Sequence, residues 1–289
     1  MPARPALPVM RIIKSVRLMQ RFSGKLPRPL VLVPTMGALH KGHLALVRKA
    51  KRLAGRTGTT AASLFVNPIQ FGPAEDFHKY PRPFHSDCEL LDSAGCQLVF
   101  APNADDMYSP NSSTTVAESD LSQVMCGASR PGHFAGVCTV VAKLFHILSP
   151  DIAVFGEKDF QQLAILRRMA RDLNFPVRIV SHPIIREQDG LALSSRNRYL
   201  SVEERRQATV IYSTLLEAEQ KVRNGWNSTS RLESWICSSI SSEKLAKVDY
   251  VVAVDPITLR RSDRITPPVL LAAAVFFGKT RLIDNRLIK

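Results

Sequence analysis

Short apolar runs alternate with longer amphipathic segments through the first two thirds of the chain. The apolar runs have the length and bounds of buried strands, and they cover residues 30–33, 60–66, 97–100, 152–155 and 177–180. Helices are predicted between them at 44–53, 87–93, 137–148 and 160–173; in 137–148 the helical spacing is carried by Val140, Val141, Leu144, Phe145 and Leu148. This alternation predicts a Rossmann-like α/β fold with a doubly wound parallel sheet, whose ligands bind at the carboxyl ends of strands.

The order of elements changes after about residue 185. Helices are predicted first, at 202–222 and 230–239, and strands follow at 248–254 and 269–276. We therefore expect two domains: residues 1–184 as the Rossmann-like domain, and residues 185–289 as a smaller α+β C-terminal lid domain.

Composition narrows the class of protein. With 289 residues, of which 45% are hydrophobic, the chain can bury a substantial core. No apolar stretch approaches the ~20 residues of a membrane helix, and the first residues lack the apolar core of a signal peptide, so we expect no membrane partner and a cytoplasmic location. The five cysteines have no Cys-x-x-Cys spacing, which favours buried free thiols over a zinc site or a disulfide framework.

A net charge of +14 raises the possibility of nucleic-acid binding. The basic residues are scattered, however, in pairs and short clusters at 48–52, 167–168, 205–206 and 260–261, with no interleaved aromatic residues for base stacking. Anionic small substrates and a solvated basic surface explain the charge as well, so no nucleic-acid partner is expected.

Residues 34–43, Pro-Thr-Met-Gly-Ala-Leu-His-Lys-Gly-His, join the first strand to the first long helix. Glycines let the backbone approach a phosphate, helix N-terminal amides face it, and the imidazoles of His40 and His43 can donate to an oxygen that gains charge. The pattern His-x-Gly-His is the adenylation signature of the nucleotidyltransferase superfamily. A histidine at a helix start can also be only a cap.

The second strand ends in two neutral amides, Asn67 and Gln70, within Phe-Val-Asn-Pro-Ile-Gln-Phe-Gly at 65–72. Such groups can bind a hydroxyl or a carboxylate without adding charge. An Asn-Pro turn in a satisfied polar loop is the alternative.

Residues 155–162, Phe-Gly-Glu-Lys-Asp-Phe-Gln-Gln, again lie between a strand and a helix. Lys158 could neutralise triphosphate charge and Asp159 could bind ribose hydroxyls or a metal, with Gln162 one helical turn beyond. The alternative for Asp159 is an N-cap.

The segment 190–197, Gly-Leu-Ala-Leu-Ser-Ser-Arg-Asn, supplies two hydroxyls and a guanidinium where the order of elements changes. Arginine binds phosphate bidentately, so a phosphate clamp is one interpretation. A polar interdomain loop is the other.

Taken together, these motifs closely resemble the pantothenate synthetase family. The resemblance runs from about Val31 to Arg-Leu-Ile-Asp-Asn at 281–285. It rests on six ordered motifs: the segments at 34–43, 65–71 and 156–159 already described, Tyr-Pro-Arg at 80–82, Ser-Arg-Pro-Gly-His-Phe at 129–134, and Leu-Ser-Ser-Arg-Asn at 193–197.

The resemblance implies an ATP-dependent ligase that joins pantoate to β-alanine through a pantoyl adenylate, releasing pyrophosphate and AMP. It implies a catalytic set of His43, His40, Lys158 and Arg196, and pantoate or β-alanine binding by Gln70, Gln162 and Asn67. The ATP-binding residues that it implies are Met36, Gly37, Ala38, Leu39, His40, Lys41, Gly42, His43, Gly156, Glu157, Lys158, Asp159, Ile185, Leu193, Ser194, Ser195 and Arg196.

The resemblance also implies Mg²⁺ and a homodimer. Mg²⁺ should contact chiefly ATP oxygens, with Asp87 as a candidate protein ligand; Ser86 precedes it where the family is more acidic.

Two other classes of protein share parts of this pattern. A cytidylyltransferase or a pantetheine-phosphate adenylyltransferase would share His-x-Gly-His but lack the amide set of Asn67, Gln70 and Gln162. A nucleic-acid-binding module would need a concentrated basic face.

Overall fold

The structure is a computed structural model that describes residues 10–73 and 75–289. Residues 1–9 lie outside the described residues, and with them the N-terminal segment that is expected to lack the apolar core of a signal peptide. Among the described helices, none is both long and apolar enough to span a membrane. All five cysteines are free thiols, and Cys96, Cys126 and Cys138 are buried.

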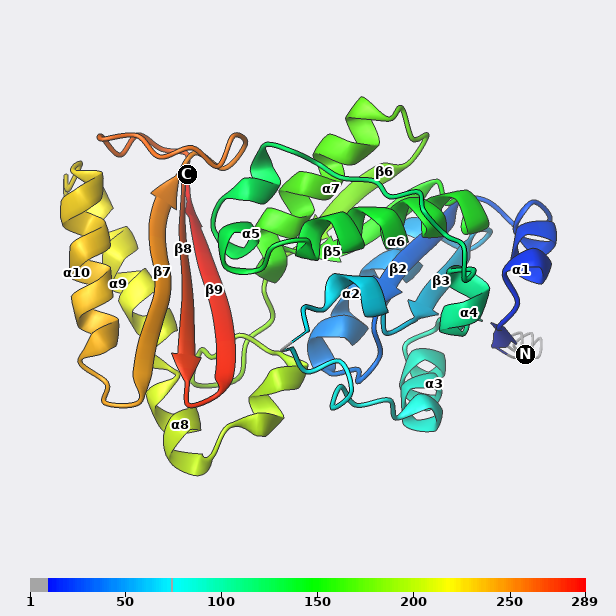
Figure 1. The fold of residues 1–289 in the computed structure, drawn as a ribbon, viewed down its shortest axis with the longest axis horizontal. Helices are drawn as coiled ribbons and strands as arrows, with labels where there is room; N and C mark the ends of the chain where they lie inside the picture. Colours follow the sequence, from blue (N-terminus) through cyan, green and yellow to red (C-terminus); the bar gives the residue numbers. More distant parts are fainter. Residues whose placement is uncertain (1–9, 74) are drawn as a thin grey trace, which may run out of the picture. The chain divides into compact units, whose positions relative to one another are not determined.

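The N-terminal part of the chain forms a six-stranded sheet with the order β1-β4-β3-β2-β5-β6. Figure 1 labels four of its strands, β2, β3, β5 and β6. Its strands are β1 (Arg11–Ile13), β2 (Leu30–Thr35), β3 (Thr59–Leu64), β4 (Leu98–Phe100), β5 (Ile152–Gly156) and β6 (Arg178–His182). The pairs β1/β4, β2/β3, β2/β5 and β3/β4 are parallel. The predicted doubly wound parallel sheet is therefore confirmed.

Helices separate these strands along the chain. They are α1 (Val16–Ser23), α2 (Lys41–Ala54), α3 (Phe84–Ser93), α4 (Ala104–Met107), α5 (Cys126–Ser129), α6 (His133–Leu148) and α7 (Phe160–Asp172). Side chains of α2 and α3 share one core cluster with β2, β3 and β4. Between β4 and β5 the chain passes from one side of β2 to the other, and α6 lies in this connection.

β2 lies between β3 and β5, where the strand order reverses. Thr35 at the end of β2 is paired with Leu64 at the end of β3, so the two loops that follow begin side by side. Ligands of open α/β sheets bind at the carboxyl ends of strands at such a reversal. The fold therefore places the segment with His-x-Gly-His at the expected edge of the sheet.

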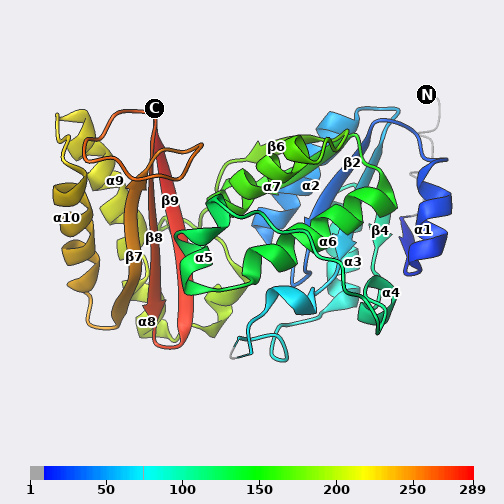
Figure 2. The same cartoon turned by 45° about the horizontal axis from the view of Figure 1, so that its top comes forward.

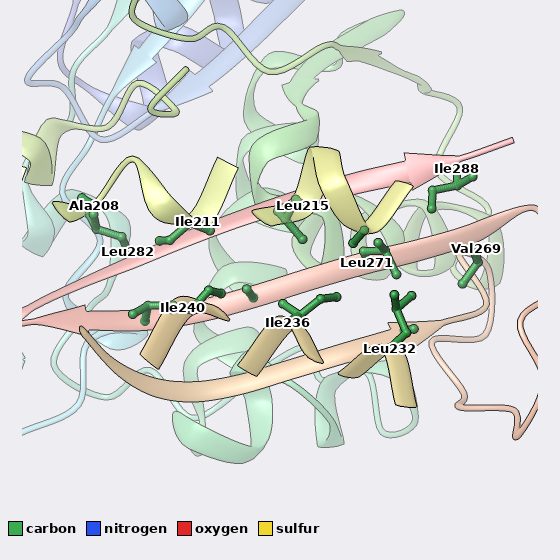
Figure 3. Packing of buried hydrophobic residues seen from close by; sticks show 14 of the residues in the cluster. Ala208, Ile211, Leu215, Leu232, Ile236, Ile240, Val269, Leu271, Leu282 and Ile288 are labelled. Carbon is green, nitrogen blue, oxygen red and sulfur yellow. The ribbon is translucent and has the colours of Figure 1, made fainter. Parts of the chain in front are cut away.

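A three-stranded antiparallel sheet forms the C-terminal part, with order β7 (Ala246–Val254), β8 (Val269–Phe277) and β9 (Thr280–Ile288). Helices α8 (Val202–Gln207), α9 (Val210–Arg223) and α10 (Thr229–Ser241) precede it (Figure 2). Ile211 and Leu215 of α9 and Leu232 and Ile236 of α10 pack with Leu271 of β8 in one buried cluster (Figure 3). This is the predicted α+β arrangement.

Contacts between Cα atoms divide the chain into two compact units. The first runs to Ala117 and also contains Ala135–Phe155 and Met169–His182; the second contains Glu118–Phe134, Gly156–Arg168 and Pro183–Lys289. The predicted domain boundary after residue 184 stays a prediction, because each unit consists of three separate stretches of the chain and no single boundary divides them.

The predicted helix at 202–222 was wrong in one respect, because it is interrupted between α8 and α9. The amide of Ile211 donates to the carbonyl of Ala208 at 3.4 Å, and the Thr209 hydroxyl donates to the Arg206 carbonyl at 2.9 Å. A side-chain hydroxyl that takes a backbone carbonyl competes with regular helical bonding.

Candidate active site

The loop after β2 is fixed to the neighbouring strand by Thr35. Its hydroxyl donates to the Ser63 carbonyl at 2.7 Å and accepts from the Gly37 amide at 3.2 Å. Gly37 and Ala38 then adopt φ values of 82° and 51°, a conformation that favours glycine and strains other residues. The loop therefore turns sharply into α2.

Asp87 of α3 anchors this loop. Its two carboxylate oxygens accept from the amides of Ala38 and Leu39, each at 2.8 Å, and the residue is only 3% exposed. A Cβ at Gly37 would lie 2.8 Å from Oδ2 of Asp87, so the contact also requires glycine. The structure thus gives Asp87 a loop-holding role that the sequence did not suggest.

Within residues 10–73 and 75–289, no group of three or more His, Cys, Asp or Glu side chains is arranged to hold a metal ion. Direct ligation of Mg²⁺ by Asp87 stays a prediction.

His40 is the N-cap of α2. Its Nδ1 accepts from the Gly42 amide at 3.1 Å, which requires that nitrogen to be unprotonated. In the neutral imidazole the proton is then on Nε2, so the cap selects one tautomer. The His43 ring lies 4.0 Å from the His40 ring, centroid to centroid, at an interplanar angle of 36°. The two predicted imidazoles are therefore adjacent at the helix N-terminus.

Asn67 and Gln70 form a buried amide network at the end of β3. The Asn67 amide group donates to Oε1 of Gln70 at 3.0 Å and to the Gly136 carbonyl at 3.1 Å, while its Oδ1 accepts from the Tyr108 hydroxyl at 2.8 Å. Gln70 in turn donates to Sδ of Met36 at 3.0 Å. The network connects the second motif to the first.

Tyr108 belongs to this network although nothing in the sequence pointed to it. Burial raises the pKa of its hydroxyl well above the usual value, so the group stays protonated and donates. The amide orientation of Asn67 follows, because its nitrogen faces the Gly136 carbonyl, which can only accept, and its oxygen faces the protonated Tyr108 hydroxyl, which donates.

In the second unit, Asn285 of β9 holds the segment at 156–159. Its amide nitrogen donates to the carbonyls of Glu157 and Lys158, both at 2.9 Å. Nζ of Lys158 lies 4.0 Å from Oδ2 of Asp159, and the Lys158 side chain is about one fifth exposed. Lys158 is therefore carried on a turn whose backbone is fixed.

Ile185 and Leu193 face each other across a hairpin. The Leu193 amide donates to the Ile185 carbonyl at 3.0 Å, and the Gly190 amide donates to the Glu187 carbonyl at 3.0 Å within the turn. Ser194 then caps the short turn Ser195–Tyr199, with its hydroxyl accepting from the Arg196 amide at 3.3 Å. The structure brings these predicted ATP-binding residues into one element.

Gln162 lies in the first turn of α7, directly after Gln161, to which the sequence assigned no role. Gln161 is 4% exposed; its Nε2 donates to the carbonyls of Leu121 and Val124, and its Oε1 accepts from the Cys126 amide. Gln162 is half-buried. The two consecutive glutamines therefore differ in role, because the side-chain amide of Gln161 is engaged by the backbone of the segment 121–126.

The predicted residues fall into two groups, one in each unit, and hydrogen bonds connect residues within each group. In the first unit, hydrogen bonds join Met36, Gln70 and Asn67, and also Ala38, Leu39 and Asp87; His40 and His43 follow at the N-terminus of α2. The second unit joins Glu157 and Lys158 to β9, and Ile185 to Leu193. Of the residues whose roles sequence reasoning missed, Asn285 and Gln161 carried a signal, because Asn285 lies in the last motif of the resemblance and Gln161 in the motif at 155–162; Tyr108 lies in none of the motifs.

Comparison with known proteins identifies the family to which these motifs belong. The chain matches the family model of pantoate-beta-alanine ligases over residues 9–287. The pantothenate synthetase of Thermoanaerobacter sp. (strain X514) is 50% identical over 275 residues, which is 95% of each chain, and that of Thermotoga neapolitana is 46% identical over 96% of this chain and 100% of the relative.

Two solved structures are also similar. A crystal structure of pantothenate synthetase from Thermus thermophilus has a TM-score of 0.90 at 44% identity, covering 96% of this chain and 99% of that one. Pantoate-beta-alanine ligase from Francisella tularensis, complexed with beta-gamma ATP and beta-alanine, has a TM-score of 0.79 at 30% identity, covering 96% and 98%. With this coverage by the family model and this identity to its members, the chain belongs to the pantoate-beta-alanine ligase family.

Proposed function

We propose that this protein is an AMP-forming pantoate–β-alanine ligase, which makes pantothenate from pantoate, β-alanine and ATP. The observation that carries the proposal is 50% identity to a pantothenate synthetase over 95% of both chains. The complex of the Francisella tularensis relative with beta-gamma ATP and beta-alanine supports two of the three substrates.

In the first step, a pantoate carboxylate oxygen attacks the α-phosphorus of ATP and the bond to pyrophosphate breaks. The attack joins an anion to a polyanion, so it needs fixed donors and positive charge rather than a protein nucleophile. We assign this role to His40, His43, Lys158 and Arg196. The capping bond at Nδ1 of His40 supports it, since it keeps the proton on Nε2, the atom to which we assign donation.

In the second step, the β-alanine nitrogen attacks the acyl carbon, the bond to AMP breaks, and the nitrogen loses a proton. Gln70 and Gln162 are the amides we assign to pantoate. Asn67 was expected beside the substrate, but its amide is engaged by Gln70, Gly136 and Tyr108, so we assign it the orientation of Gln70.

ATP is assigned to the segments 36–43, 156–159 and 193–196 and to the backbone at Ile185. We propose that Mg²⁺ enters as the ATP complex and keeps several waters, as it usually does with nucleotides. We further propose that the protein forms a homodimer and is located in the cytoplasm.

A staged assay tests this function. Pantoate and Mg-ATP without β-alanine should release pyrophosphate, and later addition of β-alanine should release AMP and pantothenate. A different nucleotidyltransferase would release no pyrophosphate with pantoate. Gln70→Ala and Gln162→Ala should each weaken pantoate binding far more than ATP binding in calorimetry; unchanged pantoate affinity would remove that residue from the substrate site.

A further inference from the structure

We propose that Asp284 and Asn285, consecutive residues of β9, position both ATP-binding segments of the second unit. The proposal rests on the function proposed above, which assigns to ATP the segment 156–159, the backbone at Ile185 and the segment 193–196. Neither residue is placed in contact with substrate, so both are positioning residues.

Asn285 fixes the direction of two peptide planes. It is 7% exposed, and its amide nitrogen uses both of its hydrogens on the carbonyls of Glu157 and Lys158. Since the C=O and N–H of a trans peptide point in opposite directions, the amides of Lys158 and Asp159 are turned away from β9. The turn that carries Lys158 is thus set by a residue more than a hundred positions later in the chain.

Asp284 fixes the hairpin that carries Ile185 and Leu193. Its carboxylate accepts from Nη1 and Nη2 of Arg186 at 2.6 and 2.9 Å, and the side chain is 4% exposed. Arg186 also donates to the Gly190 carbonyl at 3.0 Å and lies over the Tyr212 ring, with Cζ 4.0 Å from its centroid. The bidentate pair therefore ties the hairpin to β9 in one orientation.

The two contacts are joined within β9 itself. The backbone amide of Asn285 donates to Oδ1 of Asp284 at 2.7 Å, so a displacement of one segment is transmitted to the other through a single peptide. A buried ion pair is often no more stabilising than apolar residues of similar size. Stability alone therefore does not explain two buried polar residues in this strand, whereas positioning does.

Calorimetry with Mg-ATP, and separately with pantoate, tests the role at a temperature where every variant is folded. Asn285→Leu and Asp284→Asn should each raise the Kd for Mg-ATP by about tenfold or more, the loss of about 1.4 kcal/mol, and change the Kd for pantoate less than about twofold. Asn285→Ser, which keeps one hydroxyl donor, should give a smaller rise; it also provides a foldable variant if Asn285→Leu does not fold.

Asp249→Asn is the matched control. Asp249 of β7 accepts from Nη2 of Arg281 at 2.7 Å in another largely buried pair of the same sheet, and it also accepts from the Ser129 hydroxyl at 3.0 Å. Both partners lie outside the ATP-binding segments assigned above. The substitution should lower the melting temperature and leave the Kd for Mg-ATP unchanged.

Positioning is contradicted if folded Asn285 and Asp284 variants bind Mg-ATP like the wild type, or if Asp249→Asn weakens it equally. Failure of the proposed function would differ, because the wild type itself would then form no pantothenate.

Discussion

Gly136 of α6 packs directly against the backbone of Gln70. A Cβ at Gly136 would lie 2.6 Å from Cα of Gln70 and 2.7 Å from its nitrogen, and still closer to the Ile69 carbonyl. The carbonyl of Gly136 meanwhile accepts from Asn67, which orients the Gln70 amide. This close approach of helix and loop sets the position of a proposed pantoate ligand.

Gly136→Ala should therefore displace the loop at 69–70, because backbone atoms cannot yield as a flexible side chain does. We expect a pantoate KM at least about tenfold higher, the cost typical of a misplaced binding group, with a smaller change in the KM for ATP. Gly24→Ala is the control, since a Cβ there meets nothing within 4 Å. Steady-state kinetics with an unchanged pantoate KM would contradict the packing argument.

Asp87→Asn separates a loop anchor from a metal ligand. The substitution leaves only one acceptor for the amides of Ala38 and Leu39, and a lost hydrogen bond to a buried charged group costs about 1.5–3 kcal/mol. We expect lower stability and a higher Kd for ATP, both unaffected by raising the Mg²⁺ concentration. A defect that excess Mg²⁺ repairs would instead identify Asp87 as a ligand.

Much of the sheet could be predicted because its strands are simple apolar runs. The strand predicted at 30–33 and the helix predicted at 44–53 from the hydrophobic pattern lie within β2 and α2, which run further, over Leu30–Thr35 and Lys41–Ala54. β9 was not predicted, because the buried Asp284 and Asn285 interrupt its apolar pattern. The same two residues that obscured the strand hold Arg186 and the turn at Glu157.

The types of residue in the candidate site could also be predicted, but their partners could not. Local spacing indicates that Gln70 follows a strand; it carries no information that Tyr108 will reach Asn67 from 41 residues away. The loop-holding role of Asp87 likewise depends on how α3 packs, which periodicity does not specify. Long-range hydrogen bonds are the part of this site that required the structure.

Burial should make Cys96 unreactive in the folded protein. The side chain is 3% exposed, and desolvation raises the pKa of its thiol to about 12. Only about one molecule in ten thousand would carry the thiolate at pH 8, so native alkylation should miss Cys96, whereas alkylation in urea should label it. Peptide mass spectrometry after each treatment measures this; rapid native labelling would contradict it.

The same shift predicts a dependence of stability on alkaline pH. The unfolded thiol, with a pKa near 8.5, loses its proton before the folded one does, so this contribution is present below about pH 8.5 and is lost as pH rises toward 12. The melting temperature of the wild type should fall more steeply than that of Cys96→Ala between about pH 8.5 and 10.5. Parallel curves would rule out Cys96 as a source of the dependence.

His40 should have two separable roles, in capping and in catalysis. Asparagine is a good N-cap, so His40→Asn should keep the stability of α2, whereas His40→Ala should lose about 1 kcal/mol. Asparagine cannot supply the Nε2 proton, and removing one such donor typically slows a reaction by about 10²–10³. We therefore expect His40→Asn to melt like the wild type but to form adenylate as slowly as His40→Ala.

His43→Ala, which removes the adjacent imidazole without touching the cap, should be equally slow and fully folded. Single-turnover pyrophosphate release within about tenfold of the wild type in His40→Asn would confine this histidine to capping, and the same result in His43→Ala would remove the second imidazole from the chemistry.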